Sequence, residues 1–395
     1  MERLYWNNDW KFAETWEEAM KEAVYPENEM EDVRLPHTCK ELPYHYFDEH
    51  AYQMLCGYRR HFMAPEAWQG KSVELTFEGV AHDAVVYVNG TEVKAHHCGY
   101  TAFFVELAKY LKYGEDNVLA VRVDSRENLN IPPFGYAIDY MTFGGMYREV
   151  YVQVRNKTHL ADVFIKPQIH PLQVTTEITV QNISDGITLQ QEIRKKGEGA
   201  YRPLGKMPVK QTNMQTVFPV QEIRLWELEN PHLYEIRTGL WKNGEMIDAR
   251  VDITGFREAG FRKDGFYLNG KKLRLRGLNR HQSYPYVGYA APASMQIFDA
   301  DILKKELGVN AVRTSHYPQS QDFIRRCDEI GLLVFTEFPG WQHIGDEEWK
   351  RQAVQNLKEM IVQYRNHPSI ILWGVRINES QDDDVFYRET NQVAH

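Results

Sequence analysis

The sequence has few cysteines and no long apolar segment, and both absences exclude classes of protein. Its four cysteines (Cys39, Cys56, Cys98 and Cys327) stand far apart and form no closely spaced metal-binding pair, so we expect reduced, buried thiols. No stretch of about 18 apolar residues occurs, and the first residues lack the apolar core of a signal peptide. We therefore expect no membrane partner and a cytoplasmic location.

The sequence also lacks any block of like charge. It contains 46 Lys and Arg and 55 Asp and Glu, for a net charge of -9, and the two signs are interspersed. Nucleic-acid binding therefore has no electrostatic support. Aromatic residues are abundant at 13%, with 23 Tyr and nine Trp. This abundance suits either rings that stack on sugars or a β-rich core, and composition does not choose between them.

Residues 1 to about 155 have the pattern of short alternating strands. Residues 73–77 alternate, and residues 84–88 run directly into Asn89-Gly90, which is a strong signal for a β-hairpin. With 395 residues and 43% hydrophobic content, the chain is long enough for two or three domains. We expect the first domain to be an all-β sandwich.

Residues 156 to about 255 are also strand-like and show little helical periodicity. Residues 177–180 and 234–240 are examples of such strands. About a hundred residues of this kind fit an immunoglobulin-like β-sandwich. We expect Trp226 and Trp241 to lie in its core.

From residue 256 to residue 395, predicted strands alternate with predicted helices. Asp299 is expected to cap the first helix, and Gly331 to end the second. The strands are expected at residues 273–279, 310–315, 332–337 and 370–375. A (β/α)₈ TIM barrel takes roughly 250 residues, so this pattern predicts about the first half of one. We expect the chain to be the amino-terminal portion of a longer enzyme.

Glu379, preceded by Asn378, closely follows the last predicted strand. A (β/α)₈ barrel carries its chemistry on residues at the carboxyl ends of buried parallel strands. Pro368 stops the preceding helix and favours extended geometry at His367, so the segment predicts a helix, a turn, a buried strand and then an acid. From this pattern, Glu379 is either a catalytic carboxylate or an acid that caps the next helix.

Two long motifs resemble the signatures of one enzyme family. Residues 365–374 read RNHPSIILWG and are followed by Asn378-Glu379. Residues 310–318 read NAVRTSHYP, and residues 327–334 read CDEIGLLV. In this order and spacing they resemble glycoside hydrolase family 2, which holds β-galactosidases, β-glucuronidases and β-mannosidases. The loop before Asn378 is one residue longer than the commonest form and contains Arg376.

Shorter motifs extend the resemblance to the amino-terminal half. They are YRR, FEGV, YVNG and GGMYREV, at residues 58–60, 77–80, 87–90 and 144–150. They resemble the sugar-binding jelly-roll domain of the family, which is followed by an immunoglobulin-like domain and a TIM barrel. The resemblance therefore implies a jelly-roll domain at residues 1–155, an immunoglobulin-like domain at 156–255, and a truncated catalytic barrel at 256–395.

The resemblance also implies roles for individual residues. Glu379 matches the acid/base of the family, and the nucleophile of such enzymes lies on a later strand, which places it beyond His395. Asn378 matches the residue that binds the sugar 2-hydroxyl. His316 and Asp139 would bind other hydroxyls, although a core histidine and a plain loop acid are the alternatives, and Arg313 would position the carboxylates.

Two other polar residues look less suited to catalysis. Glu337 ends the third predicted strand, and we interpret it as an acid that binds a neighbouring Arg or a ligand hydroxyl rather than as the nucleophile. Gln282 stands where many members of the family carry an acid after Asn279-Arg280-His281. This substitution gives no support to a metal there, and we expect no cofactor.

The function implied by the resemblance is that of a retaining exo-β-glycosidase with a carbohydrate substrate, most simply a β-galactosidase. A β-glucuronidase and a non-catalytic carbohydrate-binding protein remain alternatives. The sequence does not decide whether the protein forms a homo-oligomer. Residues 1–395 alone should be inactive because retention takes two carboxylates. The half barrel by itself should be poorly ordered or self-associated.

Overall fold

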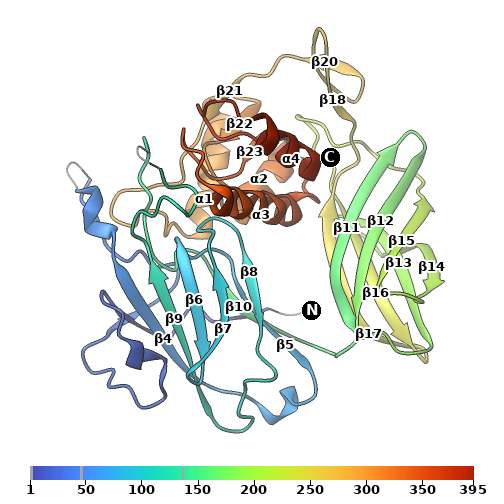
Figure 1. Ribbon diagram of the computed structural model, residues 1–395. Helices are drawn as coiled ribbons and strands as arrows, with labels where there is room; N and C mark the ends of the chain where they lie inside the picture. The colour runs from blue at the N-terminus through green and yellow to red at the C-terminus, as the bar shows by residue number, and fades with distance from the viewer. Residues whose placement is uncertain (1–2, 45–47, 136–137) are drawn as a thin grey trace.

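The computed structural model describes residues 3–44, 48–135 and 138–395, which form three parts (Figure 1). In this view the first β-sandwich lies at the lower left, the second lies at the right, and the α/β part lies above the first. The multidomain fold class expected from the sequence is confirmed. In the described part of the chain, no helix is both long and apolar enough to cross a membrane.

The first β-sandwich packs two antiparallel sheets against each other around a large apolar core. Its first sheet has the order β1 (Leu4–Tyr5), β10 (Val150–Arg155), β5 (Ser72–Phe77), β8 (Phe103–Glu106). Its second sheet has the order β3 (Glu31–Val33), β2 (Trp10–Ala13), β4 (Leu55–Met63), β9 (Asp116–Asp124), β6 (Asp83–Val88), β7 (Thr91–His96). Short 3₁₀ turns lie at Glu18–Lys21, Glu49–Tyr52 and Glu66–Trp68. Asn89 and Gly90 both have positive φ and connect β6 to β7, which confirms the predicted hairpin.

The second β-sandwich also consists of two antiparallel sheets. One has the order β11 (His159–Ile169), β12 (Leu172–Gln181), β15 (Asn213–Pro219). The other has the order β14 (Arg202–Pro208), β13 (Ile187–Lys195), β16 (Tyr234–Lys242), β17 (Glu245–Thr254). Burial alternates along β12 and β13, as expected when one face of each strand packs on the core. The prediction that Trp226 and Trp241 lie in the core of this sandwich is wrong for both residues. Trp226 is fully buried, but it packs with Leu268 and Leu333 in a separate cluster, and Trp241 lies half-buried near the end of β16.

A small antiparallel sheet that we did not predict precedes the α/β part. It consists of β18 (Ala259–Arg262), β19 (Gly265–Leu268) and β20 (Lys271–Leu273). The expected strand at residues 273–279 is therefore wrong in its first half, because the chain leaves β20 at Leu273 before a new strand begins. Two turn signals in the sequence, Asp264-Gly265 and Asn269-Gly270, mark the two hairpins of this sheet.

The α/β part is built on parallel strands flanked by helices, as predicted for a half barrel. Its sheet has the order β21 (Gly277–Asn279), β22 (Ala311–Thr314), β23 (Leu333–Glu337), β24 (Ile370–Gly374). The helices are α1 (Ala293–Asp301), which continues into a π-helical turn at Ile302–Glu306, α2 (Gln321–Ile330), α3 (Glu347–Tyr364) and α4 (Asp384–Ala394). Their apolar faces pack on the sheet in one core.

The ends of these helices are only partly as predicted. Gly331 ends α2 in the left-handed conformation, as expected, and its N–H donates to the Cys327 carbonyl. Asp299 does not cap α1, because this helix begins at Ala293 and Asp299 lies inside it. Its carboxylate instead accepts hydrogen bonds from the buried Arg280 guanidinium, with Nε at 2.8 Å.

Helix α3 connects the α/β part to the first β-sandwich. Glu359 of α3 accepts hydrogen bonds from Thr101 (2.6 Å) and lies 3.0 Å from His96 Nε2, and Gln363 accepts from the Ala102 N–H. Burial alone would raise the pKa of Glu359, but the hydrogen bonds and charge of His96, together with Thr101, lower it to about 2. The sandwich therefore holds the α/β part through an ionised carboxylate.

Candidate active site

The carboxyl ends of β22, β23 and β24 bring four of the polar residues discussed above to one edge of the parallel sheet. Arg313 lies in β22, Glu337 ends β23, and Asn378 and Glu379 follow β24. Because parallel strands end at the same edge, side chains distant in the sequence meet there. A (β/α)₈ barrel carries its chemistry at this edge.

Glu337 is the centre of a buried cluster at this edge. Its side chain is only 3% exposed. One carboxylate oxygen accepts from Arg313 Nη2 at 2.8 Å, and the other lies 2.6 Å from His316 Nδ1. The same Arg313 nitrogen donates to Asn378 Oδ1 at 2.8 Å. Glu337 thus binds a neighbouring Arg, as we interpreted it, and holds three predicted substrate-binding groups in one arrangement.

Glu379 lies beside this cluster and is exposed. Its Oε2 accepts a hydrogen bond from Gln342 Nε2 at 3.2 Å, and the Gln342 N–H donates to the Asn378 carbonyl at 2.8 Å. Glu379 has φ of 54°, a left-handed conformation that is strained for a non-glycine residue and persists only where the surroundings enforce it. The loop after β23 therefore fixes the backbone that carries the carboxylate.

The alternative role of Glu379 as a helix cap is wrong. Helix α4 is capped by Asp383, whose carboxylate accepts from the Phe386 N–H at 3.0 Å. Arg376, the charged residue of the lengthened loop, pairs with Asp382 at 2.6 Å and lies over the Tyr387 ring. Arg376 is therefore held by α4 and its preceding loop, and Glu379 is left beside the polar cluster.

Aromatic and histidine rings form one wall of the site. His316 lies 5.0 Å from the Trp341 ring and 5.6 Å from His281, measured between ring centroids. Tyr140, from the first β-sandwich, lies 5.3 Å from His281 and 6.0 Å from His316. Burial raises the pKa of Tyr140 well above its usual value. A loop of the first β-sandwich thus reaches the carboxyl edge of the parallel sheet.

Asp139 precedes Tyr140 in this loop and is exposed. Burial, followed by the charge of His316, lowers the pKa of His281, whereas the carboxylates of Asp139 and Glu337 oppose this lowering. Asp139 is therefore close enough to the site to act on it electrostatically. Whether it binds a ligand stays a prediction.

Sequence reasoning missed four residues of this site as candidates, namely Tyr140, His281, Trp341 and Gln342. Signals for some of them existed. His281 follows the first barrel strand, and Trp341 and Gln342 follow the third, at positions where barrel loops carry function. Tyr140 is preceded by the predicted Asp139, but its approach to the barrel depends on how two domains pack.

Other polar residues near the site have structural roles. Arg280 is 6% exposed and donates to Gln296 at 2.8 Å as well as to Asp299. Gln282 is fully buried and accepts from Arg148 of the first β-sandwich at 3.1 Å. Among the described residues, no group of three or more His, Cys, Asp or Glu side chains is placed to hold a metal ion.

The first residues of the motif at 365–374 lie at the opposite edge of the sheet, where the parallel strands begin. Arg365 pairs with Asp162 of the second β-sandwich, and Asn366 accepts from the Ile165 N–H at 2.9 Å. His367 Nδ1 lies 2.5 Å from the buried carboxylate of Asp328, which also accepts from the Ser369 N–H at 3.0 Å. These residues hold domains and strands together at the amino ends of the strands.

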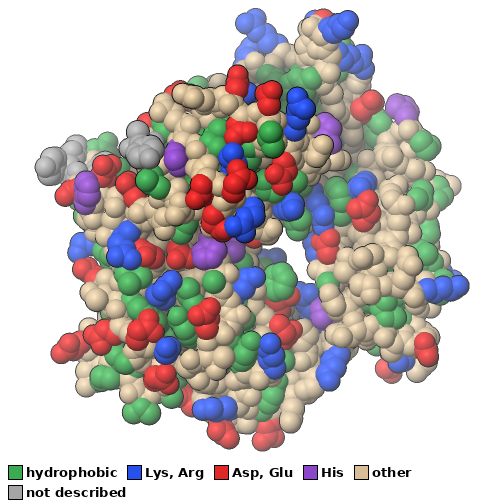
Figure 2. Space-filling view, in the orientation of Figure 1, with side chains coloured by type: hydrophobic (Ala, Val, Ile, Leu, Met, Phe, Trp, Pro, Cys, Tyr) green, Lys and Arg blue, Asp and Glu red, His purple; other side chains and the backbone are tan. Residues whose placement is uncertain are grey.

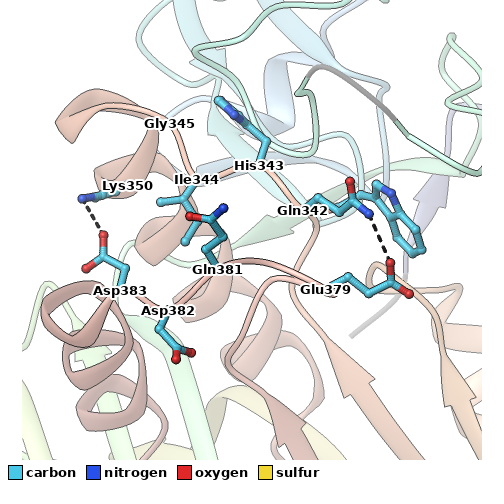
Figure 3. A pocket seen from close by; sticks show the side chains of 10 residues that line it. Gln342, His343, Ile344, Gly345, Lys350, Glu379, Gln381, Asp382 and Asp383 are labelled. Atoms are coloured by element: carbon cyan, nitrogen blue, oxygen red, sulfur yellow. Dashed lines mark hydrogen bonds and ion pairs between the residues drawn. The ribbon is translucent and has the colours of Figure 1, made fainter.

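A cavity of about 540 Å³ adjoins Glu379 on the side of the β23–α3 loop (Figure 3). Glu379 and Gln342 lie at one end, and Lys350 and Asp383 lie at the other. Lys350 Nζ and the Asp383 carboxylate are paired at 2.8 Å.

On the face of the molecule shown in Figure 2, acidic and basic side chains are interspersed over all three parts.

Comparison with known proteins gives matches along nearly the whole chain. Family models described as "Glycosyl hydrolases family 2, sugar binding domain", "Glycosyl hydrolases family 2" and "Glycosyl hydrolases family 2, TIM barrel domain" match residues 31–155, 158–257 and 260–393. A β-galactosidase of Thermoanaerobacter pseudethanolicus is 47% identical over 99% of the chain and 54% of its own length. A putative β-glucuronidase of Formosa agariphila is 31% identical over 92% of the chain and 46% of its own length.

Two solved structures superpose on nearly the whole of this chain. Bacteroides uniformis β-glucuronidase 2, covalently bound to cyclophellitol-6-carboxylate aziridine, superposes with a TM-score of 0.87 at 28% identity, covering 99% of this chain and 50% of the other. A putative β-galactosidase from Bacteroides fragilis gives a TM-score of 0.85 at 26% identity, covering 100% of this chain and 62% of the other. The chain spans about half the length of the curated relatives it matches.

Proposed function

We propose that this chain, which belongs to glycosyl hydrolase family 2, is the part of a retaining β-galactosidase that carries the acid/base carboxylate. The observation on which this depends is the position of Glu379, exposed at the carboxyl edge of the parallel sheet beside Asn378 and held by Gln342. Relatives named β-galactosidase at 47% and 46% identity support the choice of sugar.

Glu379 would protonate the glycosidic oxygen and later activate water. Retention takes a second carboxylate about 5 to 5.5 Å away, which attacks the anomeric carbon. Glu337 is a poor nucleophile because both of its oxygens are occupied by Arg313 and His316. We therefore assign the nucleophile to a later strand of a longer protein, and we expect a polypeptide of residues 1–395 to be inactive.

The cluster around Glu337 would bind the sugar that is transferred. Arg313 fixes the Asn378 amide, which would bind the 2-hydroxyl, an interaction that strengthens in the transition state. His316 and Asp139 would bind further hydroxyls.

Leu278 and Leu372, in the outer strands β21 and β24, are 47% and 39% exposed, which is consistent with further barrel strands covering this sheet.

A β-glucuronidase is the second candidate because several relatives carry that name. Recognition of a uronate carboxylate takes a cationic group. Arg313, the cation of the described cluster, is already bound to Glu337 and Asn378, which favours a neutral sugar. A non-catalytic carbohydrate-binding protein is the candidate from another class.

Hydrolysis assays with the full-length protein test these alternatives. We expect it to cleave an aryl β-galactoside much faster than the matching β-glucuronide, and proton NMR should show the β-anomer as the first product. Preference for the glucuronide would select the second candidate. Sugar binding without hydrolysis of either substrate would select the non-catalytic protein.

A further inference from the structure

Gly135, which follows β9 in the first β-sandwich, lies directly against His343 of the β23–α3 loop. Gly135 is buried. A Cβ atom added there would lie 2.4 Å from the Cβ atom of His343 and 3.0 Å from its Cγ atom. Since carbon atoms in contact are usually about 3.5–4.0 Å apart, any residue larger than glycine at position 135 would push the two loops apart by about 1 Å.

Both sides of this contact are backed by packed side chains. On the sandwich side, the neighbouring Phe134 is 1% exposed, and its ring centroid lies 4.9 Å from that of the buried His82. On the other side, the centroid of the His343 ring lies 5.8 Å from that of Trp349, which is fully buried in the core of the α/β part. Closely packed interiors transmit a displacement rather than absorb it. A displacement at Gly135 would therefore move the exposed part of the β23–α3 loop.

That exposed part contains Gln342, which lies between His343 and Glu379 (Figure 3). Gln342 Nε2 donates to Glu379 Oε2 at 3.2 Å, and the Gln342 N–H donates to the Asn378 carbonyl at 2.8 Å. Gln342 and Glu379 both have φ of 54°, a left-handed conformation that persists in non-glycine residues only where the surroundings enforce it. The close contact between the sandwich and this loop is part of those surroundings.

We propose that Gly135 is a positioning residue for the acid: because it has no side chain, the first β-sandwich contacts the β23–α3 loop closely enough to hold Gln342 against Glu379. This inference rests on the proposed function. Glu379 must lie within hydrogen-bonding distance of the glycosidic oxygen in order to protonate it. A misplacement of about 1 Å can lower the rate of such a reaction about 10²-fold. The first β-sandwich therefore takes part in the reaction through a residue outside the polar cluster.

The test is Gly135→Ala in the full-length protein, assayed with methyl β-galactoside and dinitrophenyl β-galactoside. Methanol is a poor leaving group that depends on protonation, whereas dinitrophenolate leaves without it. We expect kcat/KM to fall by about 10- to 100-fold for the methyl galactoside and by less than about threefold for the dinitrophenyl galactoside. Gln342→Ala should give the same selective loss. A change that merely loosened the fold would lower both rates together.

A second substitution tests the contact itself. His343→Gly removes the Cβ atom that the added methyl group of Gly135→Ala would meet. In the His343→Gly protein, Gly135→Ala should therefore lower kcat/KM for the methyl galactoside by less than about threefold. Gly260→Ala is the matched control, because a Cβ atom at Gly260 would have no atom within 4 Å. It should leave both substrates unaffected.

Equal losses on the two substrates in Gly135→Ala, or no loss on either, would overturn the positioning role while leaving the glycosidase intact. A selective loss that is just as large in the His343→Gly protein would overturn the contact with His343 as its cause. Should Gly135→Ala fail to fold, Gln342→Ala decides, and equal losses on both substrates in that variant would overturn the role. Failure of the unmodified protein to cleave either galactoside would overturn the proposed function and the positioning role together.

Discussion

The two edges of the parallel sheet use similar residues for different purposes. At the carboxyl edge, Glu379 is exposed and held by a neutral amide. At the amino edge, Asp328 has a side chain only 4% exposed and is bound to His367 and to the Ser369 N–H. A carboxylate with an open side can exchange a proton with a ligand, whereas a carboxylate enclosed by donors can only hold structure.

The signature motif at residues 365–374 begins at the amino edge of the sheet and runs toward the carboxyl edge. Residues 365–374 begin with groups that dock the second β-sandwich and lead into the strand that delivers Asn378 and Glu379. The motif therefore combines a stability element with the strand that leads to the residues we propose for catalysis. In TIM-barrel enzymes, the carboxyl ends of strands carry catalysis and the amino ends carry stability.

The largest expected effect comes from Glu379→Gln in the full-length protein. Loss of general acid catalysis should lower kcat/KM by roughly 10²–10⁴ for substrates with poor leaving groups, and by much less for activated aryl galactosides. The melting temperature should hardly change, because the side chain is exposed. Glu389→Gln, at an exposed position on α4, is the control. Equal losses for both classes of substrate would argue against the acid role.

At the amino edge we expect the opposite result from Asp328→Ala. Removal of this carboxylate leaves the Ser369 N–H and His367 without their partner in a buried place, and should lower the free energy of unfolding by roughly 3 kcal/mol. Urea denaturation measures this loss, while kcat/KM should stay near that of the unmodified protein. Asp116→Ala removes an exposed partner of His61 and should cost less than about 1 kcal/mol. A variant of normal stability and low activity would contradict the distinction between the edges.

A smaller effect is expected at the contact between α3 and the first β-sandwich. The pKa of Glu359 falls from 4.5 to about 2 in the folded protein, so folding favours the ionised form by up to about 3 kcal/mol. This stabilisation is complete above about pH 4.5 and is lost as the pH falls toward 2. Glu359→Gln should therefore destabilise the protein most above pH 4.5, and the difference from the unmodified protein should shrink on acidification.

Denaturation curves at several values between pH 6 and pH 3 measure this difference. Glu347→Gln provides the comparison, since its side chain at the start of α3 is 89% exposed. Its effect should stay below about 1 kcal/mol. A difference between Glu359→Gln and the unmodified protein that is constant with pH would show that the ionised contact does not hold this interface.

Features that depend on neighbouring residues in the chain could be predicted from the sequence. The hairpin at Asn89-Gly90, the end of α2 at Gly331 and the parallel strands of the half barrel follow from turn chemistry and periodicity. The unpredicted small sheet at residues 259–273 belongs to the same class, because Asp264-Gly265 and Asn269-Gly270 are local signals that were present. The placement of Glu379 after a strand end is likewise a local property.

The tertiary structure alone decided which groups meet. Gln342 reaches Glu379 because two loops lie together, Glu337 joins Arg313 to His316 because neighbouring strands end at one edge, and Tyr140 enters because two domains pack. Each contact joins residues far apart in the chain, and its existence depends on the sum of many packing interactions. The sequence by itself determined the catalytic candidate, and the fold determined its partners, because a side chain's chemistry is local whereas its surroundings are not.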